Sequence, residues 1–298
     1  MGLGRTLAVG LQGVDGFLVR VESDVSAGLP AFTVSGRADR ACAQAVDRVR
    51  AGAANGGYPL PARRITVNLS PASLPKVGSG FDLAIAVAVL VASGQLPGML
   101  AESVVHLGEL GLDGTVRAIR GVLPLTSAAA RAGVRDVVVP AGNVAEARLV
   151  RGIAMHPVAR LADLVERYRA GEDAWHSAPD TALEIDLPGN RTPAPEDEAP
   201  SPDLADVAGQ DEARHALEVA AAGGHHLYLV GPPGAGKTML AERLPGLLPA
   251  LDDDEATEVT AIGSLLGTLR DPGAFQRRPP FVAPHHGASL AAMVGGGS

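Results

Sequence analysis

An eight-residue loop in the last quarter of the chain constrains the fold more than any other feature of the sequence. Residues 231–238 read Gly-Pro-Pro-Gly-Ala-Gly-Lys-Thr and match the pattern G-x-x-x-x-G-K-[ST] at every fixed position. In that pattern a strand runs into a glycine-rich turn whose main-chain N–H groups face phosphate oxygens, and a helix follows. The apolar run 226–230 precedes the loop and a helix-like run follows it. The sequence therefore predicts an α/β unit that binds a nucleoside triphosphate.

Two residues of the loop have separate expected roles. Lys237 would neutralise the β- and γ-phosphates, and the Thr238 hydroxyl would hold a magnesium ion. Of the 25 basic residues only Lys76 and Lys237 are lysines, and a compact ammonium fits a crowded phosphate site better than a planar guanidinium. We therefore interpret Lys237 as required by its site. The nucleotide-binding residues predicted here are Gly231, Pro232, Pro233, Gly234, Ala235, Gly236, Lys237, Thr238 and Met239.

Composition limits the class of protein. The chain has 298 residues, enough for about two domains, and its hydrophobic residues (46%) include few aromatics (3%), which suits an α/β core of Ala, Val, Leu and Ile. The single cysteine, Cys42, excludes an internal disulfide and is interpreted as a small buried helix residue. The N-terminus does not read as a secretory signal, and the longest apolar run, 83–92, is about half of a membrane span. We expect a soluble, cytoplasmic protein without a membrane partner.

An acidic, proline-rich segment divides the chain. Residues 172–203 contain nine acidic residues and one basic residue, a net charge of −8, and six prolines. Such a composition cannot bury enough apolar surface to become ordered. It predicts a disordered linker at 171–202 between a domain at 1–170 and another at 203–298. The other charges balance at 24 acidic against 24 basic residues, so they neither require nor exclude a DNA-binding face.

Short β-like and helix-like runs alternate before the linker, which is typical of one α/β domain. Beyond the linker we predict a helix, the strand that leads into the phosphate loop, and a helix that a proline ends. The predicted strands are 17–21, 32–35, 65–69, 104–107, 137–139 and 226–230. The predicted helices are 39–54, 81–93, 122–132, 161–169, 210–222 and 239–244, the last ended by Pro245.

A series of short motifs runs along nearly the whole sequence. In the first half they are Gly28-Leu29-Pro30, the run 64–69 (Arg-Ile-Thr-Val-Asn-Leu), Leu74-Pro75-Lys76, Phe81-Asp82-Leu83 and Leu107-Gly108-Glu109-Leu110. In the second half they are the run 203–210 (Asp-Leu-Ala-Asp-Val-Ala-Gly-Gln), the run 220–225, the run 258–262, Pro284-His285-His286 and Val294-Gly295-Gly296-Gly297.

In their residues and their order, these motifs resemble the YifB/ComM family of magnesium-chelatase-like AAA+ ATPases. The resemblance implies a fold and a function. It implies an N-terminal α+β domain similar to the Lon protease domain, of ribosomal-S5-like fold, then the acidic linker and an incomplete P-loop AAA+ domain. The complete motor would bind ATP and Mg²⁺ and form a homo-hexamer. ComM-like members are helicases that drive branch migration of DNA during natural transformation, so DNA is the implied partner. The resemblance also places Val207 and Gln210 near the adenine.

The catalytic residues of Lon-like proteases are missing from the first domain. Their segment Pro-Lys-x-Gly-Pro-Ser aligns with 75–80 and puts Gly80 at the serine position, while Leu123 stands at the lysine position. Ser79 is one residue off, and its lysine candidate, Lys76, is too close in sequence to reproduce the family's geometry. Because a nucleophile without a base in reach is not activated, we expect a pseudoprotease. We interpret Lys76 as a turn lysine, and the alternative for its glycine loop is contact with a phosphate or a neighbouring subunit.

We identify no catalytic residue for ATP hydrolysis. An AAA+ motor needs a second apolar run ending in Asp-Glu, and none follows the phosphate loop. The run 247–255 is superficially similar, but Pro249 breaks the strand and Asp252 with Glu255 matches a helix capping box. In the family the acidic motif follows soon after the glycine run reached at 297. We therefore expect the chain to stop within the motor domain and to bind ATP without efficient turnover.

Weaker features leave other functions open. His285-His286 is a poor metal pair because adjacent histidines diverge on a strand and chelate poorly on a helix, but by resemblance it faces the ring pore, where it would contact DNA or a neighbouring subunit. Arg277-Arg278 could contact phosphates, although a solvated charge pair is the default. One alternative function is a magnesium-chelatase ATPase subunit, which the Lon-like domain argues against. Another is a nucleotide-binding assembly module without turnover.

Overall fold

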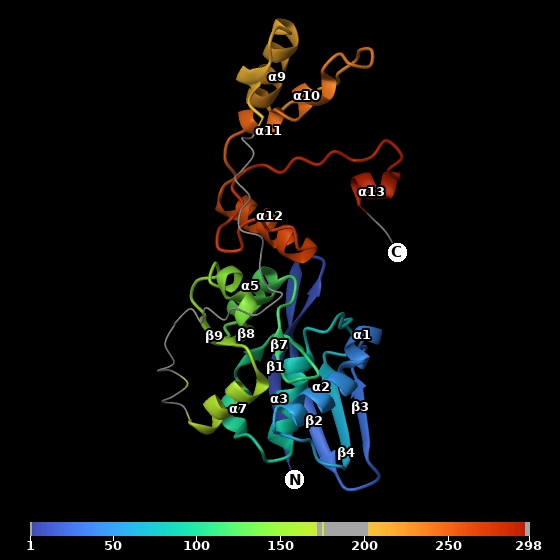
Figure 1. Cartoon of the computed structure of the whole chain (residues 1–298), viewed down its shortest axis with the longest axis vertical. Helices are drawn as coiled ribbons and strands as arrows, with labels where there is room; N and C mark the ends of the chain where they lie inside the picture. The colour runs from blue at the N-terminus through green and yellow to red at the C-terminus, as the bar shows by residue number, and fades with distance from the viewer. Residues whose placement is uncertain (1, 172–174, 176–201, 296–298) are drawn as a thin grey trace. The chain divides into compact units, whose positions relative to one another are not determined.

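The computed structural model describes residues 2–171, 175 and 202–295, and these form two compact units. The first unit contains 2–171, 175 and 260–275, and the second contains 202–259 and 276–295. Both are drawn in Figure 1. The predicted linker at 171–202 lies almost entirely outside the described residues.

The first unit is built on a seven-stranded sheet with the order β3-β4-β2-β1-β5-β8-β9. The β1–β2 and β2–β4 pairs are antiparallel, and the other neighbouring pairs are parallel. Strands β1 and β2 form a hairpin through Gly13 and Val14, where the positive φ of 63° at Gly13 suits a tight turn. The strands are β1 Leu3–Gln12, β2 Asp15–Ser26, β3 Ala31–Ser35, β4 Arg64–Ser70, β5 Val105–His106, β8 Asp136–Pro140 and β9 Ala154–Val158, beside a separate pair, β6 Glu109–Leu110 and β7 Val116–Arg117.

Helix α3, Asp82–Ala92, is the centre of the core of this unit. All of its residues except Val91 are buried, because it packs against β1 and β2 and is covered on its other side. Gly4 of β1 allows this close approach, since a Cβ there would lie 2.0 Å from the Ala88 carbonyl oxygen. The other helices are α1 Arg40–Ala43, α2 Ala45–Asn55, α4 Gly98–Ala101, α5 Val122–Arg131, α6 Val144–Ala147 and α7 Leu161–Arg169, with a 3₁₀ turn at Ala141–Asn143.

Two polar networks lie inside this core. Asp82 is fully buried and accepts two hydrogen bonds from Arg48, at 2.5 Å from Nε and 2.9 Å from Nη2. Elsewhere Thr6, His106 and Tyr168, all fully buried, form a chain in which the ring nitrogens of His106 contact Thr6 Oγ1 and Tyr168 Oη at 2.7 Å each. Each polar side chain of these two networks therefore has a partner, as buried polar groups generally require.

The second unit has helices but, among its described residues, no strand. Its core consists of Leu204, Val207, Leu217 and Leu240. Its elements are the 3₁₀ turn η2 Leu204–Asp206, α9 Asp211–Gly223, α10 Lys237–Ala241, α11 Leu244–Leu247 and α13 Leu290–Val294. Helix α12, Asp253–Leu266, begins in this unit's residues and ends in those of the first.

Residues 260–275 are grouped with the first unit, and hydrogen bonds show why. The Ser264 hydroxyl contacts the buried carboxylate of Glu146, and the Gly121 N–H donates to the Ser264 carbonyl at 3.3 Å. At the other end of α12 the predicted capping box is confirmed. Glu255 N–H donates to Asp252 Oδ1 at 2.8 Å, and Asp252 N–H donates to Glu255 Oε2 at 3.1 Å.

Most predicted elements of the first unit are confirmed. Helix 161–169 has the predicted bounds, helices 81–93 and 122–132 differ by one residue at one or both ends, and helix 39–54 is split at Gln44. The five predicted strands all occur. Strands β1 and β9 and the short pair β6 and β7 were missed.

Two predictions for the second unit are wrong. Residues 226–230 do not form a strand, and Tyr228 and Val230 are 89% and 80% exposed. A single strand has no ladder hydrogen bonds, and no described residue of this unit supplies a partner strand. The helix predicted at 239–244 ends at Ala241. Pro245 therefore does not end that helix and instead lies in the first turn of the next one, α11.

Candidate functional site

The loop 231–238 has the backbone conformation that its glycines suggest. Gly234 and Gly236 have φ of 82° and 79°, in the left-handed region that favours glycine, and Gly236 is the N-cap of α10. A Cβ at position 236 would also lie 3.1 Å from Gln210 Nε2 and from Met239 Cε. The loop therefore turns sharply into the helix, as the motif requires.

The Lys237 side chain contacts the first two residues of this loop. Its ammonium donates to the Gly231 and Pro232 carbonyl oxygens at 2.8 Å each. It forms no ion pair with a carboxylate among the described residues. Carbonyl oxygens are neutral, so they leave the positive charge uncompensated, and phosphate oxygens are stronger partners for it.

The loop also has main-chain donors without a partner in the described residues. Within the described part of the chain, the N–H groups of Gly234, Gly236, Lys237 and Thr238 find no acceptor. The first N–H groups of a helix are normally unpaired, so those of Lys237 and Thr238 are available to an anion. The Thr238 side chain is exposed at the start of α10. The residues present therefore fit a phosphate group with a bound magnesium ion.

The structure brings Gln210 to the loop and places Val207 in the small core of the unit. Gln210 precedes α9 with a φ of 61°, and its Nε2 donates to the Ala235 carbonyl at 3.0 Å. Val207 is only 3% exposed and belongs to the small core of the unit, against which Met239 is partly buried. Gln210 is thus remote in sequence but bonds to the loop directly, whereas Val207 belongs to the small core and Met239 packs against it.

Two protein families and several known proteins match this chain. A family described as "Subunit ChlI of Mg-chelatase" matches residues 21–143, and one described as "Magnesium chelatase, subunit ChlI" matches 203–298, which include the loop. An uncharacterized protein of Mycobacterium tuberculosis (strain H37Rv) is 49% identical over 298 residues, covering 100% of this chain and 57% of that protein. The uncharacterized protein YifB of Salmonella typhimurium is 42% identical over 286 residues, and the competence protein ComM of Haemophilus influenzae is 40% identical over 289, each covering 96% of this chain and 54% of the relative.

This chain belongs to the YifB/ComM family of magnesium-chelatase-like proteins. The family is of the AAA+ ATPase type. The chain spans just over half the length of the relatives that it matches.

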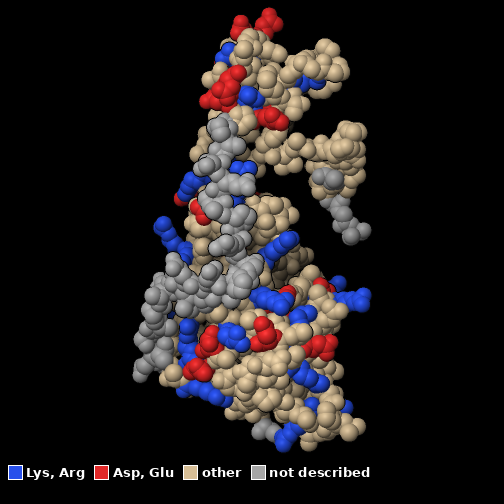
Figure 2. Space-filling view, viewed as in Figure 1, with Lys and Arg blue, Asp and Glu red and all other residues tan. Residues whose placement is uncertain are grey.

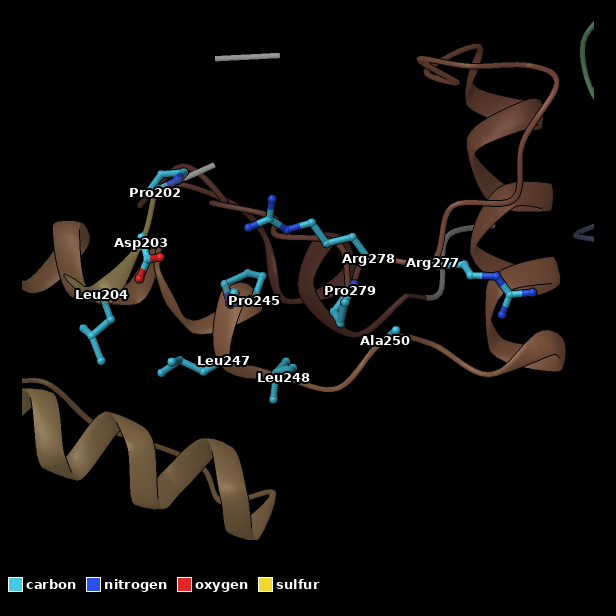
Figure 3. Close-up of a pocket in the computed structure, with 11 residues that line it drawn as sticks. Pro202, Asp203, Leu204, Pro245, Leu247, Leu248, Ala250, Arg277, Arg278 and Pro279 are labelled. Carbon is cyan, nitrogen blue, oxygen red and sulfur yellow. The ribbon is translucent and has the colours of Figure 1, made fainter. Parts of the chain in front are cut away.

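A separate hollow in the second unit is formed by η2, α11 and residues 277–279 and has a volume of ≈ 470 Å³. None of the residues that line it belongs to the phosphate loop. Figure 3 shows the Arg278 side chain extending over Pro245, while Arg277 extends toward a neighbouring helix. The Arg277 side chain forms an ion pair with Asp253, with Nη2 and Oδ1 2.5 Å apart. The two arginines that the sequence pairs thus differ, because Arg278 forms no ion pair within the described residues.

The histidine pair offers no metal site among the described residues, where no group of three or more potential ligands occurs. The rings of His285 and His286 lie with centroids 4.0 Å apart, and the Gly287 N–H donates to His285 Nδ1 at 3.1 Å.

Around Ser79 the structure contains a contact that the sequence did not predict. The Ser79 hydroxyl donates to Oε2 of Glu109, which the chain places 30 residues away. Lys76 is fully buried, and its ammonium donates to the carbonyl oxygens of Pro71 and Leu74, so it holds its own turn. Cys42 is buried too, and burial, aided by the charges of Asp39 and Asp82, raises the pKa of its thiol to about 12.

No helix within the described residues is long and apolar enough to cross a membrane.

Proposed function

We propose that this chain binds ATP and Mg²⁺ at residues 231–239 and contributes the nucleotide site of an AAA+ ATPase. The observation that carries the proposal is the G-x-x-x-x-G-K-T loop itself, with its two left-handed glycines and a lysine ammonium held by two carbonyl oxygens. Membership of the YifB/ComM family supports it.

Each part of the loop has a task in this proposal. The main-chain N–H groups of Gly234 and Gly236 would donate to phosphate oxygens, and Lys237 would exchange its two carbonyl partners for the β- and γ-phosphates. The Thr238 hydroxyl would hold the magnesium ion, which supplies charge neutralisation at the phosphates. Gln210 keeps the loop in place through the Ala235 carbonyl, and Val207 lies in the small core of the same unit.

In the whole protein we propose a homo-hexameric DNA motor of the branch-migration type, acting in the cytoplasm. The Haemophilus relative is named a competence protein, which supports a role in DNA uptake. The first domain, 1–170, is proposed as a Lon-like pseudoprotease and 203–298 as part of the AAA+ domain, joined by the acidic linker at 171–202. Among the described residues no strand ends in Asp-Glu, so we propose that this chain alone binds ATP without efficient turnover.

Calorimetric titration with ATP and Mg²⁺ tests the binding site. We expect Lys237→Ala to weaken binding about ten- to hundredfold, the range for a hydrogen bond to a charged group. Lys237→Arg is the matched control for charge, and it should bind weakly too because a guanidinium does not fit. Thr238→Ala should reduce the affinity gained by adding Mg²⁺. Equal affinity of Lys237→Ala and the unaltered chain would contradict the proposal.

A magnesium-chelatase subunit is the second candidate, since both matching families carry that description. The full-length protein separates the two. Forked DNA should stimulate ATP turnover by a DNA motor, whereas a porphyrin with partner subunits should stimulate a chelatase. Binding of ATP without stimulation by either would favour the assembly module.

A further inference from the structure

Strand β3 leaves one side of the sheet unpaired. It is the outermost strand in the sheet order, as Figure 1 shows, and among the described strands it pairs with β4 alone. The Ala31 N–H donates to the Arg63 carbonyl at 3.3 Å, so Ala31 and the alternate residues after it face β4. Phe32 and Val34 consequently direct their N–H and C=O groups outward. Neither residue's main chain forms a hydrogen bond on that side with any described residue.

The opposite edge of the same sheet is protected. The Ala154 N–H of β9 donates to the Arg135 carbonyl at 2.8 Å, which turns Met155 and Pro157 outward. Proline has no N–H, so β9 lacks one of its two outward donors, a common device against strand addition. Strand β3, Ala31–Ser35, contains neither a proline nor a charged residue.

Arginines line the open edge. All are exposed, and none forms an ion pair with a carboxylate among the described residues. They are Arg63 and Arg64 beside the start of β3, Arg50 with its guanidinium 5.9 Å from the ring centre of Phe32, and Arg37 and Arg40 after its end. Figure 2 shows Lys and Arg atoms along the margin of the first unit where Figure 1 draws β3.

The carboxylates of this region do not neutralise the arginines. Asp39 accepts hydrogen bonds from the Cys42 and Gly78 N–H groups, at 2.7 and 3.1 Å. Asp24 on β2 and Asp47 on α2 are exposed and form no ion pair with these arginines. The edge therefore combines unpaired main-chain groups with uncompensated positive charge.

We infer that β3 accepts an extended acidic peptide, from another protein, as an added strand. Outward donors and acceptors at Phe32 and Val34 repeat at the two-residue spacing of a peptide main chain, which a nucleic-acid backbone does not reproduce. Carboxylates of the peptide would then contact the arginines at the start of β3, beside Phe32 and after the end of the strand. Leu29, 84% exposed just before β3, offers the peptide an apolar contact.

Fluorescence anisotropy on the 298-residue chain tests this inference. The probe is a labelled octapeptide of alternating Glu and Val, compared with a Lys/Val octapeptide, an N-methylated Glu/Val octapeptide and a single-stranded oligonucleotide of twenty thymidines. We expect only the unmodified acidic peptide to bind. Val34→Pro removes an outward N–H without removing a bond to β4, so it should weaken binding about tenfold.

Charge reversal measures the contribution of the arginines. Arg50→Glu and Arg64→Glu should each lower the peptide affinity about three- to tenfold. Arg131→Glu, at the exposed end of α5, is the matched control and should leave it unchanged. If Val34→Pro does not fold, the N-methylated peptide still measures the need for main-chain bonds on the unaltered chain. Equal binding of both acidic peptides, preferential binding of the oligonucleotide, or binding of no probe would overturn the inference.

Discussion

The two compact units differ in how well they cover their apolar residues and in their charge. In the first, nearly every residue of α3 is buried, whereas the second has a core of four buried residues and exposes Tyr228 and Val230. The described residues of the first carry 19 basic and 14 acidic side chains, a net +5, and those of the second carry 5 and 11, a net −6. The phosphate-loop motif at 231–238 thus lies in the thinly packed second unit. The well-packed first unit has no sequence motif that points to a reaction as clearly.

Breaking the buried ion pair of the first unit should have the largest effect. In Arg48→Ala the fully buried Asp82 keeps only the Leu110 N–H at 3.2 Å, while burial already raises the pKa of its carboxyl. We expect the free energy of unfolding of this unit to fall by about 3–5 kcal/mol. Urea denaturation followed by Trp175 fluorescence measures it, because Trp175 is the only tryptophan and is buried in this unit.

A double variant controls for the lost volume. Arg48→Met with Asp82→Leu removes both charges, so it should be less destabilised than Arg48→Ala alone. A loss below about 1 kcal/mol in Arg48→Ala would mean that water reaches Asp82 and that the first unit is less tightly packed than described.

How far the sequence predicts each unit follows from the range of the interactions. Helix 161–169 and the capping box of Asp252 and Glu255 depend on residues three or four apart, and both were found from sequence. Strand 226–230 depends on a neighbouring strand, and the prediction was wrong because none is present in the described residues. The Ser79–Glu109 and Gln210–Ala235 contacts join residues 30 and 25 apart. Only the fold brings such pairs together.

Two glycine substitutions contrast the packing of the units. A Cβ at Gly4 would meet the Ala88 carbonyl oxygen at 2.0 Å, whereas one at Gly234 would meet nothing within 4 Å. We expect Gly4→Ala to destabilise the first unit by about 1–3 kcal/mol through overpacking. Gly234→Ala should leave the transition reported by Trp175 unchanged and cost about 1–2 kcal/mol locally, from its positive φ of 82°. Equal effects on the Trp175 transition would remove the contrast.

Acidification should weaken the first unit through a buried histidine. Burial lowers the pKa of His106 to about 3, so the folded state keeps the ring neutral where the unfolded chain, with a pKa near 6.5, takes up a proton. This contribution to stability is complete above pH 6.5 and is lost as the pH falls toward about 3. Urea midpoints at pH 7 and 4.5 should therefore differ more for the unaltered chain than for His106→Gln. Parallel pH profiles would show that another group causes the change.

The smallest expected effect is the reactivity of Cys42. Its thiol is buried, and burial raises its pKa to about 12, so almost none is thiolate at pH 8. A thiol reagent should label the folded chain slowly and the urea-unfolded chain at once, because it attacks the thiolate. The chain has no other cysteine, so the signal belongs to this site alone. ATP bound at the phosphate loop should leave the slow rate unchanged if the first unit stays folded independently of nucleotide. Fast labelling of the folded chain would instead show that the helices around Cys42 open readily. The conclusion that the first unit is the more tightly packed of the two would then be wrong.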